Sequence, residues 1–569
     1  MGHLSIMQTD DKQTAQAIQW VDSVLENVRP LHTDVLVLGA GLAGLRAAVR
    51  AKSLGRDVVM AYAGRGASPF IIGCNAPFGH AEPADTPMQY AQDVMAGGYG
   101  LSDTALVQAL CDGATRGVRE LAALGVNIAR NGERFAQRQL SGNWYARSVF
   151  HPAGLGAEAL STLATHAKQL GVVALPGHRA LKLLLSGERV CGALLREQRT
   201  GEWRPVLASA VVMALGGLGQ LYEDSTYPAD ITSSAYALGY DAGAPLVDME
   251  FVQFEPFVTF KPEALRGLEL PTSMLAEGAQ LLNSAGERFM FRHNPSWGER
   301  RVEKAKLSLC IQQEIDEGRG LDGGVLYDAS RVPAATVEGY VRHCRRLRKA
   351  GVDPAKLRIP VRPAAHSQMG GLWIDATGCT PVQGLFAAGE AAGGLHGASR
   401  IAGNGATDAL VFGDLAGASA AALPVPPPHD WRTAVREALG TLGAIGSEHG
   451  TLNADDVRAQ VRGLMSRHVG LYRTAASLQT TLQELGAMTE RFKCDARVAS
   501  DAERAEAFAT LGMARVGQAV TAAALARTES RGAHQRRDHP QTDDAAWRVH
   551  VVVQEEAGAG MSVATRPLR

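Results

Sequence analysis

Apolar and polar positions near the start of the chain follow the order of a βαβ unit. Asp34–Leu38 has the continuous apolar character of a buried strand, an Ala- and Leu-rich helix continues through Leu54, and Asp57–Tyr62 indicates a second parallel strand. Residues 1–30 precede this unit and are polar and mixed, with one helical stretch at 15–28. We therefore predict an N-terminal extension, followed by a Rossmann-like α/β domain.

The pattern changes again farther along the chain. Residues 245–345 mix strands with a charged helical stretch, and the apolar, Gly-rich segment 385–394 then indicates a return to the first sheet. The predicted divisions are an extension at 1–30, an α/β domain in two segments (31–244 and 346–422), an inserted α+β domain at 245–345, a helical domain at 430–540 after the Pro-rich break 424–429, and a polar tail at 541–569.

A glycine triplet connects the first strand to its helix. Gly39 would allow the tight turn, Gly41 would admit a pyrophosphate to the helix N-terminus, and Gly44 would let the helix pack on the strand. The second strand ends in Met60-Ala-Tyr62, without the Asp or Glu that binds a ribose in NAD enzymes. The pattern therefore predicts a dinucleotide other than NAD, and the alternative is a Gly-rich turn that binds nothing.

Longer motifs carry a resemblance to a known family. They are Asp248–Phe254, Gly286–Met290, Ala365–Gly371, Gly384–Asn404 and Arg527–His534. In this order the chain resembles the flavoproteins of succinate dehydrogenase, fumarate reductase and L-aspartate oxidase over about residues 32–540. The resemblance implies FAD as cofactor, with the two α/β segments forming the FAD-binding domain and the inserted region forming a capping domain over the substrate.

The resemblance also implies which residues hold the cofactor. Glu390 would bind the adenosine ribose, and backbone at Ala388, Gly389, Asn404 and Gly405 would line the flavin. The full set of expected cofactor residues is Gly39, Gly41, Leu42, Ala43, Gly44, Ser68, Ala214, Gly216, Gly389, Glu390, Asn404 and Gly405. Pro69 stands where the membrane-bound members carry the histidine that links FAD covalently, so we expect non-covalent FAD.

The resemblance is less complete at the substrate site. His366 and Arg400 match the family's substrate-binding His and Arg, although His366 has the alternative of being a core histidine. Glu255 replaces a histidine that binds a carboxylate in the family. It would accept a hydrogen bond from a cationic or hydroxylated substrate, act as a base, or form a structural salt bridge. Lys304 takes the place of the proton-shuttling Arg, with Arg300 and Arg301 nearby. The loop 275–280 is shortened, and His151 is a weaker candidate at the rim.

These departures lead to several functional hypotheses. The first is an FAD-dependent oxidoreductase that transfers a hydride between the flavin and a carbon beside a carboxylate or carbonyl, and that acts poorly or not at all on succinate and fumarate. The alternatives are the flavoprotein subunit of an electron-transfer complex with a separate iron–sulfur or other carrier protein, an oxidase of the L-aspartate oxidase type, and an inactive flavin-binding assembly protein. For the first alternative, Arg527–His534 fits a docking role, because it lies in the helical domain on which the family's partners often pack.

Composition limits the kinds of partner and cofactor that we expect for this protein. The 569 residues carry a formal net charge of −1, so no overall field recruits nucleic acid. The seven cysteines include no Cys-x-x-Cys pair, which predicts neither a metal site nor an internal iron–sulfur cluster and favours reduced thiols in a cytoplasmic protein. No uninterrupted apolar stretch reaches the roughly 18 residues expected of a transmembrane helix.

Overall fold

A seven-stranded sheet forms the centre of the first domain. The computed structural model describes residues 2–151, 153–300, 302, 304–424, 430–556 and 560–569. The sheet has the order β8-β2-β1-β11-β10-β9, with β18 beside β11; these strands are β1 (Leu31–Leu38), β2 (Val58–Tyr62), β8 (Val173–Pro176), β9 (His178–Ser186), β10 (Arg189–Glu197), β11 (Trp203–Met213) and β18 (Leu385–Ala387). The strands β1, β2, β8, β11 and β18 pair in parallel. Because such strands are covered on both faces, they carry apolar runs, and Val35–Leu38 is fully buried.

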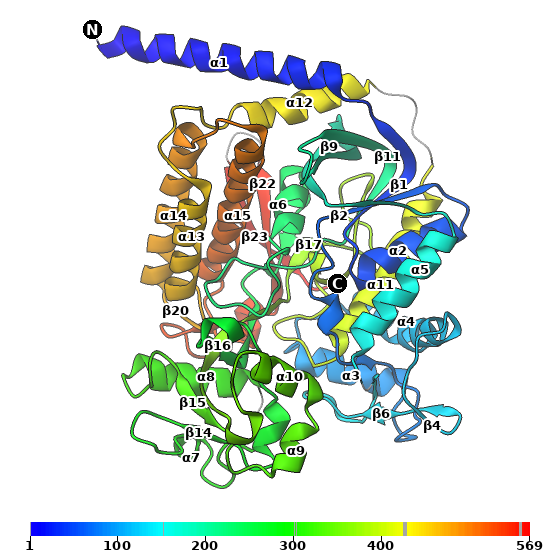
Figure 1. The fold of residues 1–569 in the computed structure, drawn as a ribbon, viewed down its shortest axis with the longest axis vertical. Coiled ribbons are helices and arrows are strands. Elements are labelled where there is room, and N and C mark those ends of the chain that lie inside the picture. The colour runs from blue at the N-terminus through cyan, green and yellow to red at the C-terminus, as the bar shows by residue number, and fades with distance from the viewer. Residues whose placement is uncertain (1, 152, 301, 303, 425–429, 557–559) are drawn as a thin grey trace.

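The two sequence segments of this domain are joined by helix packing (Figure 1). A Cβ at Gly413 would lie 2.6 Å from the Ala43 carbonyl oxygen, and one at Gly417 would lie 2.5 Å from that of Ala47. Glycine therefore lets the second segment's helix lie directly on the first helix. The helices here are α2 (Leu42–Ser53), α3 (Pro87–Gly97), α4 (Thr104–Ala123), α5 (Leu155–Gln169) and α11 (Asn404–Ala422), with short strands β3 (Cys74–Asn75), β4 (Arg130–Asn131), β5 (Arg134–Phe135), β6 (Gln137–Arg138) and β7 (Ser148–Val149).

The inserted domain has its own sheet and its own hydrophobic core. Its strand order is β13-β16-β15-β14, and its elements are β13 (Val252–Thr259), β14 (Gln280–Leu282), α7 (Met290–His293), α8 (Lys304–Asp316), β15 (Val325–Asp328), α9 (Ala334–Glu338), α10 (Val341–Lys349) and β16 (Arg358–Gln368). The core includes Leu347, Ile359 and Val361. The capping domain therefore extends past the predicted boundary at 345, because β16 pairs with β13 before the chain returns to the first domain.

Helices dominate the C-terminal region, as the apolar spacing predicted. They are α12 (Trp431–Gly443), α13 (Ala454–His468), α14 (Ala475–Asp495) and α15 (Asp501–Ala526). The N-terminal α1 (Gly2–Asn27) lies along α12 (Figure 1). The indole nitrogens of Trp20 and Trp203 both donate to Asp501, at 2.7 and 2.6 Å, which joins the extension to both domains. Residues 425–429, most of the predicted Pro-rich break, lie outside the described part.

The predicted polar tail is wrong for most of its length. Its β22 (Val549–Glu556) and β23 (Gly560–Pro567) form a hairpin in a five-stranded sheet of order β19-β17-β12-β22-β23, completed by β12 (Leu246–Val247), β17 (Gly371–Trp373) and β19 (Ala392–Gly393). Val551–Val553 is buried. Because this apolar run is short and lies between charged residues, the sequence did not predict the strand. Among the described residues, no helix is long and apolar enough to cross a membrane.

Candidate functional site

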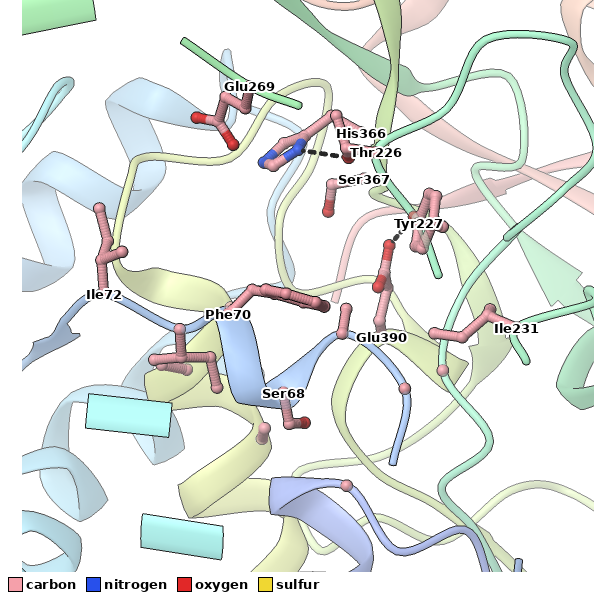
Figure 2. A pocket seen from close by; sticks show the side chains of 18 of the residues that line it. Ser68, Phe70, Ile72, Thr226, Tyr227, Ile231, Glu269, His366, Ser367 and Glu390 are labelled. Carbon is pink, nitrogen blue, oxygen red and sulfur yellow. Dashed lines mark hydrogen bonds between the residues drawn. The ribbon is translucent and has the colours of Figure 1, made fainter. Parts of the chain in front are cut away.

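A cavity of about 2220 Å³ lies between the FAD-binding and capping domains. Typical ligand pockets measure roughly 300–1,000 Å³, so this one has room for a dinucleotide and a second molecule. The Gly39 turn and Glu390 line it from the first domain, and Glu255 and Lys304 line it from the capping domain. Figure 2 shows Ser68 and Glu390 toward one end and Glu269 and His366 toward the other.

The glycine turn has the geometry that a dinucleotide requires. Gly39 has φ +112°, and a Cβ there would lie 2.2 Å from the Ala214 carbonyl oxygen. A Cβ at Gly44 would lie 2.0 Å from the Gly39 carbonyl oxygen, so both glycines serve backbone packing. Gly41 faces the cavity near Ser68, whose Oγ accepts the Leu42 amide at 2.9 Å.

The predicted cofactor residues fall into two groups. The residues that line the cavity are Gly39, Gly41, Leu42, Ala43, Ser68, Ala214, Gly216, Gly389, Glu390 and Gly405. Gly44 and Asn404 are not among them. The Asn404 side chain is buried and its Oδ1 accepts from Asn75 and Tyr90, both at 2.7 Å. Its side chain therefore holds the start of α11 in place.

Glu390 is fixed from several sides before any ligand is present. Its Oε1 accepts the Gln368 amide at 2.8 Å and the Tyr227 hydroxyl, as Figure 2 shows for the tyrosine. Burial raises the pKa of this carboxyl above its ordinary value, while the bonds from Tyr227 and Gln368 oppose that rise. The carboxyl lines the cavity, and its chemistry as a hydrogen-bond acceptor fits a ribose hydroxyl. The glycine turn, the helix N-terminus and Glu390 together fit an FAD molecule.

The substrate end holds a compact group of ionisable side chains. Lys304 Nζ lies 2.8 Å from both carboxylate oxygens of Glu255 and 3.4 Å from Glu269 Oε1. Glu255, Glu269 and His366 lie close together: one carboxylate oxygen of each glutamate and one ring nitrogen of the histidine are all within 4.8 Å of one another. No metal was predicted here, and Lys304 already supplies a cation to both carboxylates.

Burial and neighbouring charges set the protonation of this group. Burial, reinforced by Glu269, raises the pKa of Glu255 to about 7. Burial alone would lower the pKa of Lys304, but Glu255 and Glu269 raise it above its ordinary value. Burial would likewise raise the pKa of Glu269, but Lys304 and His366 hold it below its usual range. The cluster can therefore hold or release one proton near neutral pH, and Glu255 is the carboxyl that titrates.

His366 and Arg400 both face the same end of the cavity. His366 Nδ1 is hydrogen-bonded with the Thr226 hydroxyl at 2.9 Å, and Figure 2 shows the ring facing Glu269. Burial lowers the pKa of His366 to about 4, so the ring is neutral at pH 7. Arg400 Nη2 makes one long contact of 3.5 Å with Gln253 Oε1, and its buried Nε has no partner among the described atoms. The guanidinium is thus available to a ligand.

Some residues at this site were missed by the sequence. They are Glu269, Thr226 and Tyr227. Glu269 lies in Gly267-Leu-Glu-Leu270, outside every motif, and reaches the site because Val258 and Glu269 form a β-bridge. Of the alternatives, His151 lines the cavity while Arg300 does not, and Arg301 lies outside the described residues.

The motif Arg527–His534, considered as a docking surface, is buried instead. Arg527, Glu529 and His534 have 0% exposure, and Arg531 has 5%. Arg527 and Arg531 both donate to Glu529. These side chains therefore hold the C-terminal region together and are not available to a partner protein.

The fold and the cavity define a dinucleotide-binding flavoprotein, and comparisons with known proteins agree. The FAD binding domain family matches residues 34–406, and the fumarate reductase flavoprotein C-terminal family matches 458–569. One fumarate reductase (CoM/CoB) subunit of Methanothermobacter marburgensis is 32% identical over 90% of this chain and 95% of its own. L-aspartate oxidase of Mycobacterium bovis is 33% identical over 90% and 93%. The structure of Mycobacterium smegmatis Sdh1 in complex with UQ1 has a TM-score of 0.86 and 29% identity, and covers 95% of each chain.

The chain belongs to the flavoprotein family that includes fumarate reductase, succinate dehydrogenase and L-aspartate oxidase. It is an FAD-dependent oxidoreductase, which confirms the predicted fold class, cofactor and enzyme class.

Proposed function

We propose that this enzyme transfers a hydride between FAD and a carbon beside a carboxylate or carbonyl, on a small substrate other than plain succinate or fumarate. The observation that carries the proposal is the Glu255–Lys304–Glu269 cluster beside His366. Bound FAD supplies the hydride donor or acceptor. The side chains described here bind the substrate and move its proton.

Charge at the substrate end argues against a plain dicarboxylate. Arg400 offers a planar fork that suits one carboxylate. Across from it, two carboxyl groups share a single ammonium, so that side attracts hydrogen-bond donors more strongly than a second anion. A substrate with a carboxylate at one end and a hydroxyl or amine at the other fits this arrangement. An amino acid, as in an oxidase of the L-aspartate oxidase type, meets the same description.

Glu255 is positioned to exchange the substrate proton. A general base works best when its pKa lies near the working pH, and burial brings Glu255 to about 7. Lys304 keeps its proton and stabilises the carboxylate once it forms. His366 is neutral and can donate to a substrate oxygen without adding charge.

Anaerobic reduction of the holoenzyme's flavin by a substrate panel tests this function. The panel pairs succinate with amino and hydroxy acids of matched length. We expect bleaching by an amino or hydroxy acid, and at least about 10-fold slower reaction with succinate, because a charge-assisted partner is worth about 1.5–3 kcal/mol. Fumarate reduction on the order of 10 per second would overturn the proposal.

FAD attachment, partner and location are further parts of this proposal. Pro69 has no nucleophilic side chain, so acid precipitation of the protein should release the flavin into the supernatant. An electron-carrier partner, such as an iron–sulfur protein, is supported by the similarity to a relative named as one component of a fumarate reductase. Co-purification from the native host tests it. A cytoplasmic location is supported by cysteines that are all free, and cell fractionation tests it.

A further inference from the structure

One face of α10 places cationic side chains at the mouth of the cavity. Arg342, Arg345 and Arg346 all line it, and positions three and four apart lie on the same side of a helix. Cys344 and Leu347 on the opposite side are buried in the capping core. The helix is therefore held by its apolar face, and its arginines line the cavity on the other side. Figure 1 places α10 near the FAD-binding domain.

The charges of these three exposed arginines are not paired with a carboxylate in the described part of the chain. Within the described residues, none of the three forms a salt bridge, whereas Arg348 on the same helix pairs with Glu338. Burial lowers the pKa of Arg346, and the neighbouring charge that adds to this effect is the cation Arg342. Glu269, a carboxylate close to α10, is engaged by Lys304 at 3.4 Å. Like charges that lie together, with no counterion among the described side chains, indicate a place for an anion.

Partly exposed apolar side chains of the FAD-binding domain also line the cavity. The Arg342 guanidinium lies 5.3 Å from the centre of the Phe70 ring. Phe70, Ile72 and Trp144 line the cavity and remain 49%, 56% and 73% exposed. Soluble proteins bury large apolar side chains where they can, and exposed ones gathered at a cavity mark a binding surface.

We propose that Arg342, Arg345 and Arg346 form a second anion site, which binds a phosphate or distal carboxylate at the far end of an elongated substrate. The inference rests on the proposed function and narrows it to longer substrates. Such a substrate carries a carboxylate beside Arg400 and a hydroxyl or amine beside Glu255, and an apolar part connects these to a second anionic group at the α10 arginines. Arg400 would hold the anionic group near the flavin. Guanidinium forks suit the oxygens of both groups, and Phe70 and Ile72 would contact the apolar part.

Binding of inorganic tripolyphosphate to the FAD-loaded protein tests this site without requiring turnover. Calorimetry compares the wild type, the double variant R345A/R346A and the control Arg348→Ala, which lies on the same helix outside the cavity. We expect the double variant to bind at least about 10-fold more weakly, because it loses charge-assisted contacts, while Arg348→Ala changes affinity less than about twofold. FAD content and thermal unfolding should match the wild type in both variants.

Several results would overturn the proposal. The first is a wild type that binds no tripolyphosphate, and the second is a double variant that binds it like the wild type. The third is a double variant that loses FAD, which would show that the arginines bind the cofactor. Sedimentation with phosphatidylglycerol vesicles that depends on Arg345 and Arg346, without tripolyphosphate binding, would indicate a membrane surface instead. If the site binds tripolyphosphate but no candidate substrate reduces the flavin, the proposed reaction fails and the anion site remains.

Discussion

Two groups of charges in this molecule each pair two glutamates with a basic side chain, but they serve different purposes. Around Glu529, Arg527 donates from its Nε, Nη1 and Nη2 to Glu250, Glu529 and the carbonyls of Trp547 and Val549, and all three charged side chains are fully buried. Around Lys304, two carboxylates share one ammonium, and the side chains of Lys304 and Glu269 are 31% and 41% exposed. Protein therefore encloses the Arg527 group, which we call the closed group. The Lys304 group faces a cavity, and we call it the open group.

The difference shows how to separate a structural charge from a functional one. All three guanidinium nitrogens of Arg527 donate, and Nη1 and Nη2 reach the carbonyls of Trp547 and Val549 at the start of β22. Arg527 therefore holds the C-terminal hairpin against the helical domain. The Lys304 group has fewer cations than anions and leaves Glu255 titrating near pH 7. A buried ion pair is therefore informative about function when its charges are incompletely matched and face a space that a ligand can enter.

The largest effect should come from breaking the closed group. Glu529→Gln removes the charge that Arg527 and Arg531 share, which leaves Glu250 beside Arg527 and Asp544 beside Arg531. Removing one member of a buried ion pair costs up to about 3–5 kcal/mol. The unfolding entropy is about 2.1 cal/mol/K per residue, so for 569 residues we expect the apparent melting temperature to fall by about 2–4 °C. Calorimetry of the FAD-loaded protein measures this, with the exposed Glu484→Gln as control. A melting temperature equal to that of the control would show that the closed group has no special structural role.

The open group should instead affect turnover. Arg400→Lys keeps a positive charge but loses the planar fork, so we expect full FAD occupancy and a loss of about 10- to 150-fold in kcat/KM. His366→Ala should behave similarly with a smaller loss. Kinetics and flavin potential are measured in the same variants. A shifted potential with unchanged substrate affinity would mean that Arg400 acts on the flavin alone.

The titration of Glu255 gives a third test. Since burial and Glu269 raise its pKa to about 7, the carboxyl is neutral below that pH and ionised above it. If Glu255 is the base, kcat/KM rises with pH through about 7 in the wild type, and Glu255→Gln loses this limb. The folded protein also holds this proton more tightly than the unfolded chain. The wild type should therefore lose stability relative to Glu255→Gln as the pH rises from about 4.5 to 7. An unchanged profile in the variant assigns the base elsewhere.

The sequence predicted those parts of the site that depend on local backbone. Gly39 and Gly41 were recognisable because a strand, a tight turn and a helix follow one another within a few residues. Glu255 and Lys304 were flagged as departures from a family pattern, but their mutual contact joins β13 to α8 across 49 positions of the chain. Periodicity carries no information about such a pairing.

Other features depended wholly on tertiary structure. Glu269 enters the site through one β-bridge, and no spacing signals that contact. The strand at Val549–Glu556 escaped because its apolar run is short and polar residues surround it, while its partners β12 and β17 lie far away in the sequence. The Arg527 motif illustrates the reverse error, because its place in the helical domain suggested a docking surface where the fold buries the side chains.

The smallest expected effect concerns Thr226, which acts through His366. Its hydroxyl is hydrogen-bonded with His366 Nδ1 at 2.9 Å and so orients the ring that faces Glu269. Thr226→Val keeps the side chain's shape and removes this bond, which is worth about 0.5–1.5 kcal/mol, so kcat should fall by about 2- to 10-fold. Thr226→Ser retains the hydroxyl and should restore most of the rate.

A merely structural role would lower the melting temperature and leave kcat intact, and the Ser variant would then restore stability alone. Because Thr226 is a positioning residue, KM and FAD content should stay near their wild-type values. Equal rates in the Val and Ser variants would show that packing orients the His366 ring. The hydrogen bond from Thr226 would then contribute nothing to catalysis by the open group.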